Sequence, residues 1–270
     1  MAFPSPTLTV PALTTWQWSF NGLTMGKTTP YAVLQAQGLD LPTVRAGDAT
    51  RARDTGQIIG LDVFGGRTVT VTFFINGTQA ATAFQTRLKA FANATRIGYS
   101  TEQPLWFKLP RLPQMCTMVR PRKRSMPWTF AFAAVTVATA AVMFHATDPR
   151  LYGAGVSSAP GVITNSGDTA MRPVLVITGA ATNPSITNTS AAGNLTVSLT
   201  ASIPSGAQVV IDLDLKTVVY YASGIAAKGG VNHLTWVNQK TWWSLVPGAN
   251  TISYSGGGTL AVQWAPAFYL

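Results

Sequence analysis

Two pairs of side chains have the types and spacing that acid–base chemistry requires. Asp212 and Asp214 lie two residues apart in an apolar run, so on a strand both carboxylates extend from one face. Glycoside hydrolases use two carboxylates about 5 Å apart or somewhat farther. The same spacing describes the solvent face of an ordinary strand, which we favour, or a calcium or surface-turn role. The second pair is His145 and Asp148, three residues apart.

Other side chains for catalysis or metal binding are scarce. The 270 residues include one Glu, two His and one Cys, and charged residues make up 10% of the chain, against about 25% in an average domain. A single Cys excludes a disulfide within the chain and argues against a Cys-based metal site. His233 is a weak ligand candidate, and no hydrolase, zinc-protease or phosphate-binding motif occurs. The sequence therefore predicts no catalytic residue, no cofactor and no metal, and a protein that is not an enzyme.

The positive charge is concentrated in the first half of the chain. Residues 1–150 hold 15 Lys and Arg against 6 Asp and Glu, whereas residues 151–270 hold 4 against 3. The densest run is Arg120, Arg122, Lys123 and Arg124. Such a run can bind an anionic partner, but no aromatic side chains are interleaved for stacking on nucleic-acid bases. We therefore interpret it as a loop between strands that is solvated or pairs with another subunit, and we expect no sequence-specific nucleic-acid binding.

Apolar periodicity predicts a mainly β protein with one helix. Val69, Val71 and Phe73 share one face of a strand over residues 67–75 and threonines share the other. Over residues 79–94, Phe84, Leu88 and Phe91 recur at helical spacing, and Thr78 suits the N-cap. We expect this helix to cover a sheet.

An uncharged stretch over residues 127–144 follows the basic run and has the length of a membrane span. Its content argues against that interpretation, because Trp128, Phe130 and Phe132 alternate with smaller residues and neither Leu nor Ile occurs. Period-two alternation is typical of a half-buried strand. We therefore expect no membrane span.

The second half has the pattern of an all-β sandwich. Short apolar segments, among them residues 208–213, 217–221 and 260–265, are separated by Gly, Asn, Pro and Ser. This spacing predicts a jelly-roll or galectin-like sandwich over residues 161–270. The polar residues 153–160 resemble a linker, which places an N-terminal domain at residues 1–152. That domain includes a charged loop over residues 45–60.

Four tryptophans lie in the last 40 residues, namely Trp236, Trp242, Trp243 and Trp264. Tryptophan supplies core volume in a sandwich, which is the interpretation that we favour, but it also stacks on sugar rings. Adjacent residues of a strand face opposite sides. Trp242 and Trp243 are therefore the candidates for a contact with a surface glycan.

The order of several short motifs resembles the siphophage distal tail proteins. In the second half, these motifs are Asn165-Ser166-Gly167-Asp168, Pro173, Gly179, Asn183-Pro184, Ile186, Val210-Ile211-Asp212, Thr217-Val218 and the segment WWSLVPGANTI over residues 242–252. The first half contributes Gly60-Leu61-Asp62 and the segment ATDPRLY over residues 146–152. The resemblance extends over nearly the whole chain, and its strength lies in the order of the motifs.

This resemblance implies a structural role in the virion. Distal tail proteins form a hexameric ring at the end of a long non-contractile tail, in which a β-rich N-terminal domain with one helix builds the ring and a galectin-like domain projects outward. The implied partners are five further copies, the major tail tube protein, the tail-tip hub protein and, transiently, the tape-measure protein. DNA would pass through the ring, and assembly would take place in the host cytoplasm.

Ring closure requires two different patches on each subunit that meet on neighbouring copies. The candidates for these patches are Arg45, Arg51, Arg53, Arg120, Arg122, Lys123 and Arg124. We expect most of the excess cations to face neighbouring proteins or the outside, because a densely basic lumen would retain DNA. The alternative function is that of a carbohydrate-binding module that contacts the host surface through the C-terminal sandwich.

Overall fold

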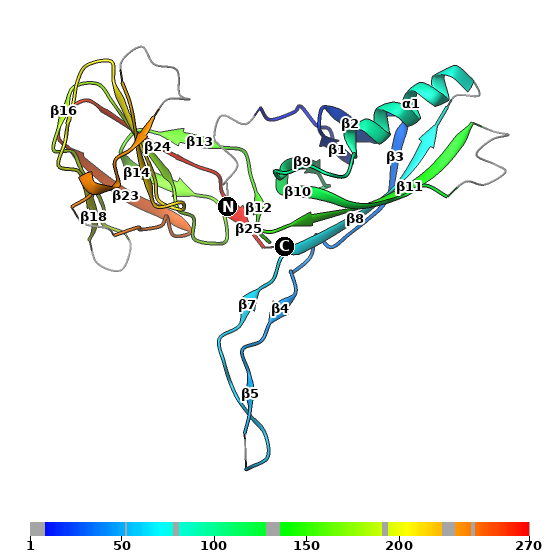
Figure 1. Ribbon diagram of the computed structural model, residues 1–270, viewed down its shortest axis with the longest axis horizontal. Helices are drawn as coiled ribbons and strands as arrows, with labels where there is room; N and C mark the ends of the chain where they lie inside the picture. The colour runs from blue at the N-terminus through cyan, green and yellow to red at the C-terminus, as the bar shows by residue number, and fades with distance from the viewer. Residues whose placement is uncertain are drawn as a thin grey trace. The chain divides into compact units, whose positions relative to one another are not determined.

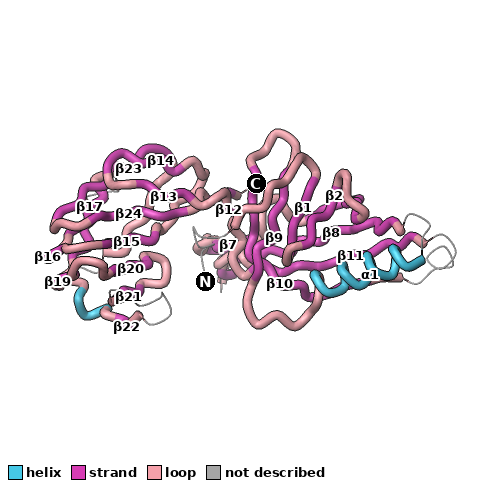
Figure 2. The backbone as a smooth tube through the Cα atoms, turned by 90° about the horizontal axis from the view of Figure 1, so that it is seen from above, coloured by secondary structure: helices cyan, strands magenta, loops and turns pink. Residues whose placement is uncertain are grey.

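The computed structural model describes residues 9–51, 53–77, 81–127, 136–190, 194–222, 230–238 and 241–269 (Figure 1). Strands are the main regular elements of these residues, and one α-helix lies among them, so the predicted mainly β fold class is confirmed (Figure 2). The chain forms two compact units. Val10–Leu151 together with Tyr269 form the N-terminal unit, and Tyr152–Phe268 form the C-terminal unit.

The N-terminal unit contains two antiparallel sheets that share one long strand. The first sheet has the order β2 (Leu23–Gly26), β1 (Gln17–Phe20), β9 (Gln103–Lys108) and the first half of β10 (Gln114–Ser125). The second has the order β10, β11 (Val137–Ala146), β8 (Arg67–Asn76) and β3 (Tyr31–Gln37). The register shifts between Pro121 and Lys123, shortly after β10 exchanges β9 for β11 as its partner. β10 thereby joins the two sheets covalently.

The core of this unit lies between the buried faces of the two sheets. In β8, Val69, Val71 and Phe73 are buried while the threonines between them are exposed or half-buried, which confirms the predicted alternation. Phe20 of the first sheet meets Phe144 of the second edge to face, with 5.0 Å between the ring centroids. Edge-to-face aromatic pairs of this kind add to the stabilisation from apolar burial.

The helix α1 (Ala81–Ala94) packs on the same apolar face of β8. The side chains of Phe84 and Phe91 are buried, and the Phe91 ring lies 5.1 Å from that of Phe73. The predicted helical stripe is therefore confirmed, whereas the expected N-cap, Thr78, lies outside the described residues. A helix that covers the sheet leaves the other face of β8 and β11 free.

The described residues within 39–66 form a long hairpin, which we call the arm. Two short ladders hold its two strands together: β4 (Val44–Arg45) pairs with β7 (Val63–Phe64), and β5 (Ala49–Thr50) pairs with β6 (Gln57–Ile58). The arm extends away from the sheets of the N-terminal unit (Figure 1). The segment predicted as a charged loop is therefore an extended hairpin.

The C-terminal unit contains two larger antiparallel sheets and one small one. Their strand orders are β13-β24-β15-β20-β21-β22, β14-β23-β17-β18 and β16-β19. The elements are β12 (Leu151–Tyr152, at the unit boundary), β13 (Val156–Ser158), β14 (Gly161–Asn165), β15 (Val174–Thr178), β16 (Ala181–Thr182), β17 (Ser185–Asn188), β18 (Leu195–Ser198), β19 (Ser202–Ile203), β20 (Gln208–Asp212), β21 (Thr217–Tyr221), β22 (Val231–Asn232), the 3-10 helix η1 (Leu234–Trp236), β23 (Gly248–Ser255), β24 (Thr259–Trp264) and β25 (Ala267–Phe268). Each larger sheet buries alternate residues, as in a sandwich.

One predicted segment has a different structure from the one expected, and another lies partly outside the described residues. Residues 153–160 were expected to form a linker, but residues 156–158 form β13 and pair with β24. The expected strand around Trp128, Phe130 and Phe132 lies outside the described residues, whereas the remainder of that uncharged stretch belongs to β11. Within the described part of the chain, no helix is long and apolar enough to cross a membrane.

Candidate subunit-contact surfaces

The arm exposes more apolar surface than its length explains. Ile59 is 91% exposed, Leu61 81%, and Leu41 and Ile58 58% each. Single exposed apolar residues are ordinary, but a group of them along one thin element marks a contact surface for a protein partner. The arm is therefore the first candidate contact surface.

The predicted arginines of the arm are exposed. Arg45 lies in β4, and Arg51 and Arg53 lie near the tip. The Nη1 atom of Arg51 lies 3.6 Å from Oδ2 of Asp54, and such an exposed pair contributes little to stability. Arg45 and Arg53 have no ion pair among the described residues, so their charges are available to a partner.

Arg67 fixes the base of the arm. Its side chain is 2% exposed, and its Nε donates to the carbonyl of Pro149 at 2.7 Å. Its Nη1 donates to the carbonyls of Gly38 (3.0 Å) and Asp40 (2.5 Å), where the arm begins. Burial lowers the pKa of the guanidinium, and the nearby Asp40 partly opposes this shift. One buried cation thus joins both ends of the arm to the segment after β11.

The acidic residues near the start of the arm form hydrogen bonds and an ion pair within the subunit. Asp148 forms a bidentate ion pair with Arg150, with the closest contact 2.8 Å from Nη2 to Oδ2. Glu102 accepts hydrogen bonds from the backbone N–H and the hydroxyl of Thr147 at 2.8 and 2.9 Å. His145 instead lies 3.4 Å from the Thr68 hydroxyl. The expected pair of His145 and Asp148 is therefore not assembled for acid–base chemistry.

The basic run lies on β10, so the prediction of a loop is wrong. A strand tolerates these charges because its alternate residues face solvent. Arg120 is opposite His145, and Lys123 is opposite Met143, on the face that points away from the core. Arg124 points the other way and donates from Nη1 to the carbonyl of Ala92 at 2.6 Å, at the end of α1.

The four residues of the basic run therefore have different roles. Arg124 supports the end of the helix, Arg120 is half-buried, and Arg122 and Lys123 are exposed. Only the two exposed residues combine accessible charge with freedom to pair outside the chain. They are the second candidate contact surface.

Acidic residues are distributed unevenly over the N-terminal unit. Residues 1–39 and 103–147, which supply most strands of both sheets, contain neither Asp nor Glu. Besides Glu102 and Asp148, the acidic residues of this unit all lie on the arm: Asp40, Asp48, Asp54 and Asp62. The sheets are thus uniformly basic, and the arm carries the exposed carboxylates.

Buried asparagines account for the motifs of the second half. Asn165, Asn188 and Asn250 are at most 1% exposed. Their side-chain amides donate to three successive carbonyls: Asn188 to Ser244 (3.1 Å), Asn165 to Leu245 (3.2 Å) and Asn250 to Val246 (2.8 Å). These bonds fix the backbone of the loop, and the Leu245 carbonyl also accepts from the N–H of Met171 at 2.9 Å. The motifs therefore specify a loop conformation rather than a catalytic site.

The tryptophan pair behaves differently from the prediction of a glycan surface. Trp243 is 2% exposed and belongs to the core, so the prediction that it contacts a surface glycan is wrong. Trp242 is half-buried. His233 stacks on Trp236 with 3.8 Å between the ring centroids, which gives this histidine a packing role.

The paired aspartates form a turn at the end of β20. Oδ1 of Asp212 accepts hydrogen bonds from the backbone N–H groups of Asp214 and Leu215, both at 2.9 Å. Asp214 lies 3.8 Å from Nη1 of Arg172. This arrangement fits the surface-turn alternative. Among the described residues, no three His, Cys, Asp or Glu side chains are grouped as a metal site would require.

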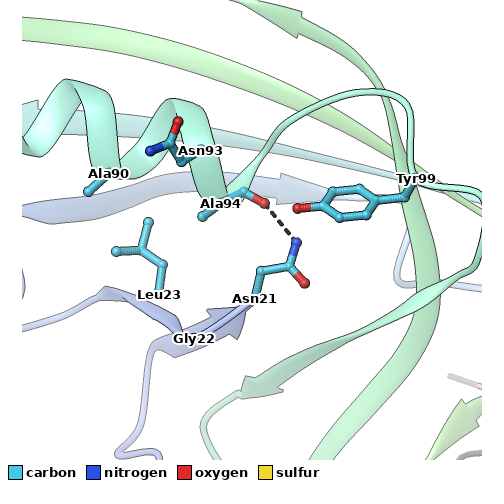
Figure 3. A pocket seen from close by; sticks show the side chains of 7 residues that line it. All are labelled: Asn21, Gly22, Leu23, Ala90, Asn93, Ala94 and Tyr99. Atoms are coloured by element: carbon cyan, nitrogen blue, oxygen red, sulfur yellow. Dashed lines mark hydrogen bonds between the residues drawn. The ribbon is translucent and has the colours of Figure 1, made fainter.

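A cavity of about 340 Å³ lies between the β1–β2 turn and the end of α1 (Figure 3). Asn21 and Leu23 line one side, Ala90 and Ala94 the other, and Tyr99 closes one end. The amide of Asn21 donates to the carbonyl of Ala94 at 2.9 Å. The side chains that line it include no charged group.

Comparisons with known proteins agree with these observations. Residues 166–268 match the family model described as siphovirus-type tail component, C-terminal domain. No curated protein sequence matches the chain. The fold is similar to that of the Dit protein of phage SPP1, described as a paradigm of the hub adsorption apparatus in phages that infect Gram-positive bacteria. The identity is 15%, the TM-score is 0.69, and the match covers 93% of this chain and 98% of that one.

Two structures of the phage P2 baseplate in its activated conformation are also similar. The structure with calcium gives 6% identity and a TM-score of 0.56, and that with strontium gives 7% and 0.55. Each match covers 92% of this chain and 97% of the other. Residues 166–268 of this chain thus match the C-terminal domain of siphovirus-type tail components in sequence, and the chain shares its fold with the Dit protein of phage SPP1 over nearly its whole length.

Proposed function

We propose that this protein is a structural subunit that forms a ring of six copies at the distal end of a siphophage tail and joins the tail tube to the tail-tip hub. The observation that carries the proposal is the similarity to the SPP1 Dit protein across both units, at 93% coverage of this chain. The structural use of Glu102, Asp148 and Asp212 agrees with a role without catalysis.

The subunit contacts of this ring are heterologous, with one patch meeting a different patch on the neighbour. We assign one patch to the arm, because its exposed Ile59 and Leu61 need a partner in an assembled particle. The second patch lies on the basic sheets, whose exposed cations include Arg122, Lys123 and Lys27. The arm holds four Asp against three Arg, whereas the charged residues in the strands of the sheets are all cations, and this difference in charge favours contact of arm with sheet over sheet with sheet.

The ring in this proposal lets DNA pass through its lumen without holding it. Each phosphate that a protein neutralises steepens the salt dependence of DNA binding by about 0.9. Several arginines are already engaged inside the subunit, among them Arg67, Arg124 and Arg150. We expect the remaining cations to serve mainly protein contacts.

The proposed partners follow from this position. They are the major tail tube protein on one side of the ring, the tail-tip hub protein on the other, and the tape-measure protein transiently in the lumen. The subunits assemble in the host cytoplasm and remain at the distal tip of the virion. A carbohydrate-binding function loses support, because burial of Trp243 removes one of its two candidate contacts.

Mass measurement of the purified chain in solution tests the proposal. The expected particle has six times the 28.6 kDa of a single chain. An Ile59→Asp, Leu61→Asp double variant should remain monomeric with an unchanged circular dichroism spectrum, while the exposed-site control Val162→Asp should still assemble. A wild-type chain that stays monomeric at high micromolar concentration would contradict the ring.

A further inference from the structure

Trp16 adopts a backbone conformation that bulky residues avoid. It is the third residue of the turn Thr14–Gln17, which is closed by a hydrogen bond from the N–H of Gln17 to the carbonyl of Thr14 at 3.1 Å. Its φ is 66°, in the left-handed region where Gly or Asn is the usual residue of such a turn. A tryptophan at this position is strained.

The strain is not relieved by burial within the subunit. Trp16 is 48% exposed, so about half of its large indole side chain faces solvent. Its backbone is nevertheless held firmly, because its N–H donates to the carbonyl of Lys108 at 2.7 Å and its carbonyl accepts from the N–H of Lys27 at 3.0 Å. Gly26 permits this approach, since a Cβ there would lie 2.0 Å from the Trp16 carbonyl oxygen. An exposed side chain on a strained and fixed backbone indicates a functional contact.

Three further exposed residues belong to the two turns whose backbone Trp16 contacts through Lys27 and Lys108. Lys27 and Thr28 belong to the adjacent β2–β3 turn, and Arg111 belongs to the β9–β10 turn. Thr28 and Arg111 also have left-handed φ values, 67° and 64°. We call these four residues the Trp16 rim. Tryptophan and arginine are the residue types that most often dominate the energy of protein interfaces.

The rim lacks any charge partner of its own. Lys27 and Arg111 form no ion pair among the described residues, and the sheets around them contain no carboxylate. The exposed carboxylates of this unit lie on the arm, where Asp62 follows the exposed Ile59 and Leu61. The arm segment 58–62 thus offers what the rim lacks, an apolar surface beside a negative charge.

The arm of the same copy is not placed to fill the rim, because it extends away from β1 and β2 (Figure 1). We propose that the Trp16 rim receives the arm segment 58–62 of a neighbouring copy, with Trp16 against its apolar side chains and Lys27 and Arg111 beside its carboxylates. This inference rests on the proposed ring and names the surface that accepts the arm.

Zero-length carbodiimide cross-linking of the assembled wild-type protein tests the pairing. This reagent joins a carboxylate to a lysine amine in direct contact, and a mixture of ¹⁵N-labelled and unlabelled subunits separates contacts between copies from those within one. The expected cross-links between copies join Asp62 or Asp48 to Lys27 or Lys108. If arm carboxylates are instead joined to Lys123 or Lys89 alone, the inference is wrong while the ring remains.

The Trp16→Gly variant distinguishes the effect of backbone strain on stability from the effect of the side chain on association. Because Gly accepts the left-handed φ, the melting temperature of the free subunit should be unchanged or higher, while its association should weaken at least tenfold. Lys27→Glu should weaken association about tenfold, and the added Asp62→Lys should recover most of that loss. Lys89→Glu on the exposed face of α1 is the control. Association within twofold of wild type for Trp16→Gly would overturn the inference, and a monomeric wild-type chain would overturn both it and the ring.

Discussion

Replacing Arg67 with methionine tests whether one buried cation holds the base of the arm. Methionine retains most of the apolar volume of the arginine stem and removes all of its donors. In the wild-type protein those donors reach the carbonyls of Pro149, Gly38 and Asp40. The variant therefore leaves three carbonyl groups without their partner.

The expected loss of stability follows from the exposure of those carbonyls. Asp40 is exposed, so water can replace the lost bond there, whereas Pro149 and Gly38 are half-buried. An unpaired buried carbonyl costs about 1–2 kcal/mol, and the variant regains part of the free energy needed to bury a charge. We expect the free energy of unfolding of the N-terminal unit to fall by about 2–3 kcal/mol, or its melting temperature by about 4–12 °C.

Urea titration and differential scanning calorimetry measure this change. Arg67→Lys keeps the charge but not the fork of donors, so it should lose nearly as much as Arg67→Met. Arg53→Met, on the exposed arm, is the matched control and should stay within about 0.5 kcal/mol of wild type. If Arg67→Met lies equally close to wild type, the three hydrogen bonds do not hold the arm, and the reasoning fails.

Three other predictions concern the core, a buried thiol and the arm. Trp243→Ala should destabilise the C-terminal unit by about 3–5 kcal/mol and Trp242→Ala by far less, which denaturant unfolding distinguishes. Burial raises the pKa of Cys116 to about 12 from 9.0, so the native thiol should resist a disulfide reagent at pH 8 that modifies the unfolded chain. Because the folded state holds the thiol proton more tightly than the unfolded state does, the free energy of unfolding should fall as the pH rises from 9 towards 12. The comparison is with Cys116→Ala. If the difference in unfolding free energy between wild type and this variant does not change over that pH range, the raised pKa is contradicted. Trypsin should cleave the free subunit first after Arg45, Arg51 or Arg53, and assembly should protect these sites, whereas equal cleavage in both states would argue against arm contacts.

Periodicity predicted the elements whose burial follows a simple alternation. The strand with Val69, Val71 and Phe73 and the helix with Phe84 and Phe91 were predicted because their neighbours in sequence already reveal one apolar face. The strands at residues 208–213 and 217–221 correspond to β20 and β21 for the same reason. Local pattern is enough where one side of an element is buried along its whole length.

Positions that depend on distant partners were not predictable in this way. The basic run was expected to be a loop because charge dominates its composition, yet β11 pairs with it and lets Lys123 face solvent. The charged segment over residues 45–60 is a hairpin whose four short strands carry little apolar alternation. Which of Trp242 and Trp243 is buried depends on the packing of the two sheets.

The residues predicted as subunit contacts differ in their exposure, and which of them meet a neighbouring copy stays a prediction. Arg122 and Lys123 are exposed as a subunit contact requires, but Arg124 is held by the carbonyl of Ala92, which lies 32 residues away in sequence. The Trp16 rim gave no sequence signal at all, because nothing in the sequence around Trp16 reveals a positive φ. Backbone strain is visible only once the turn is seen.

The shared strand β10 has a mechanical consequence for the N-terminal unit. Gln114–Val119 pair with β9 and Arg120–Ser125 pair with β11, so a single stretch of covalent backbone runs through both layers. Pulling the layers apart along this strand must shear several backbone hydrogen bonds at once, rather than open them one after another. A tensile load that enters one layer therefore reaches the other through the chain itself, and the unit should resist stretching along β10 far better than across it.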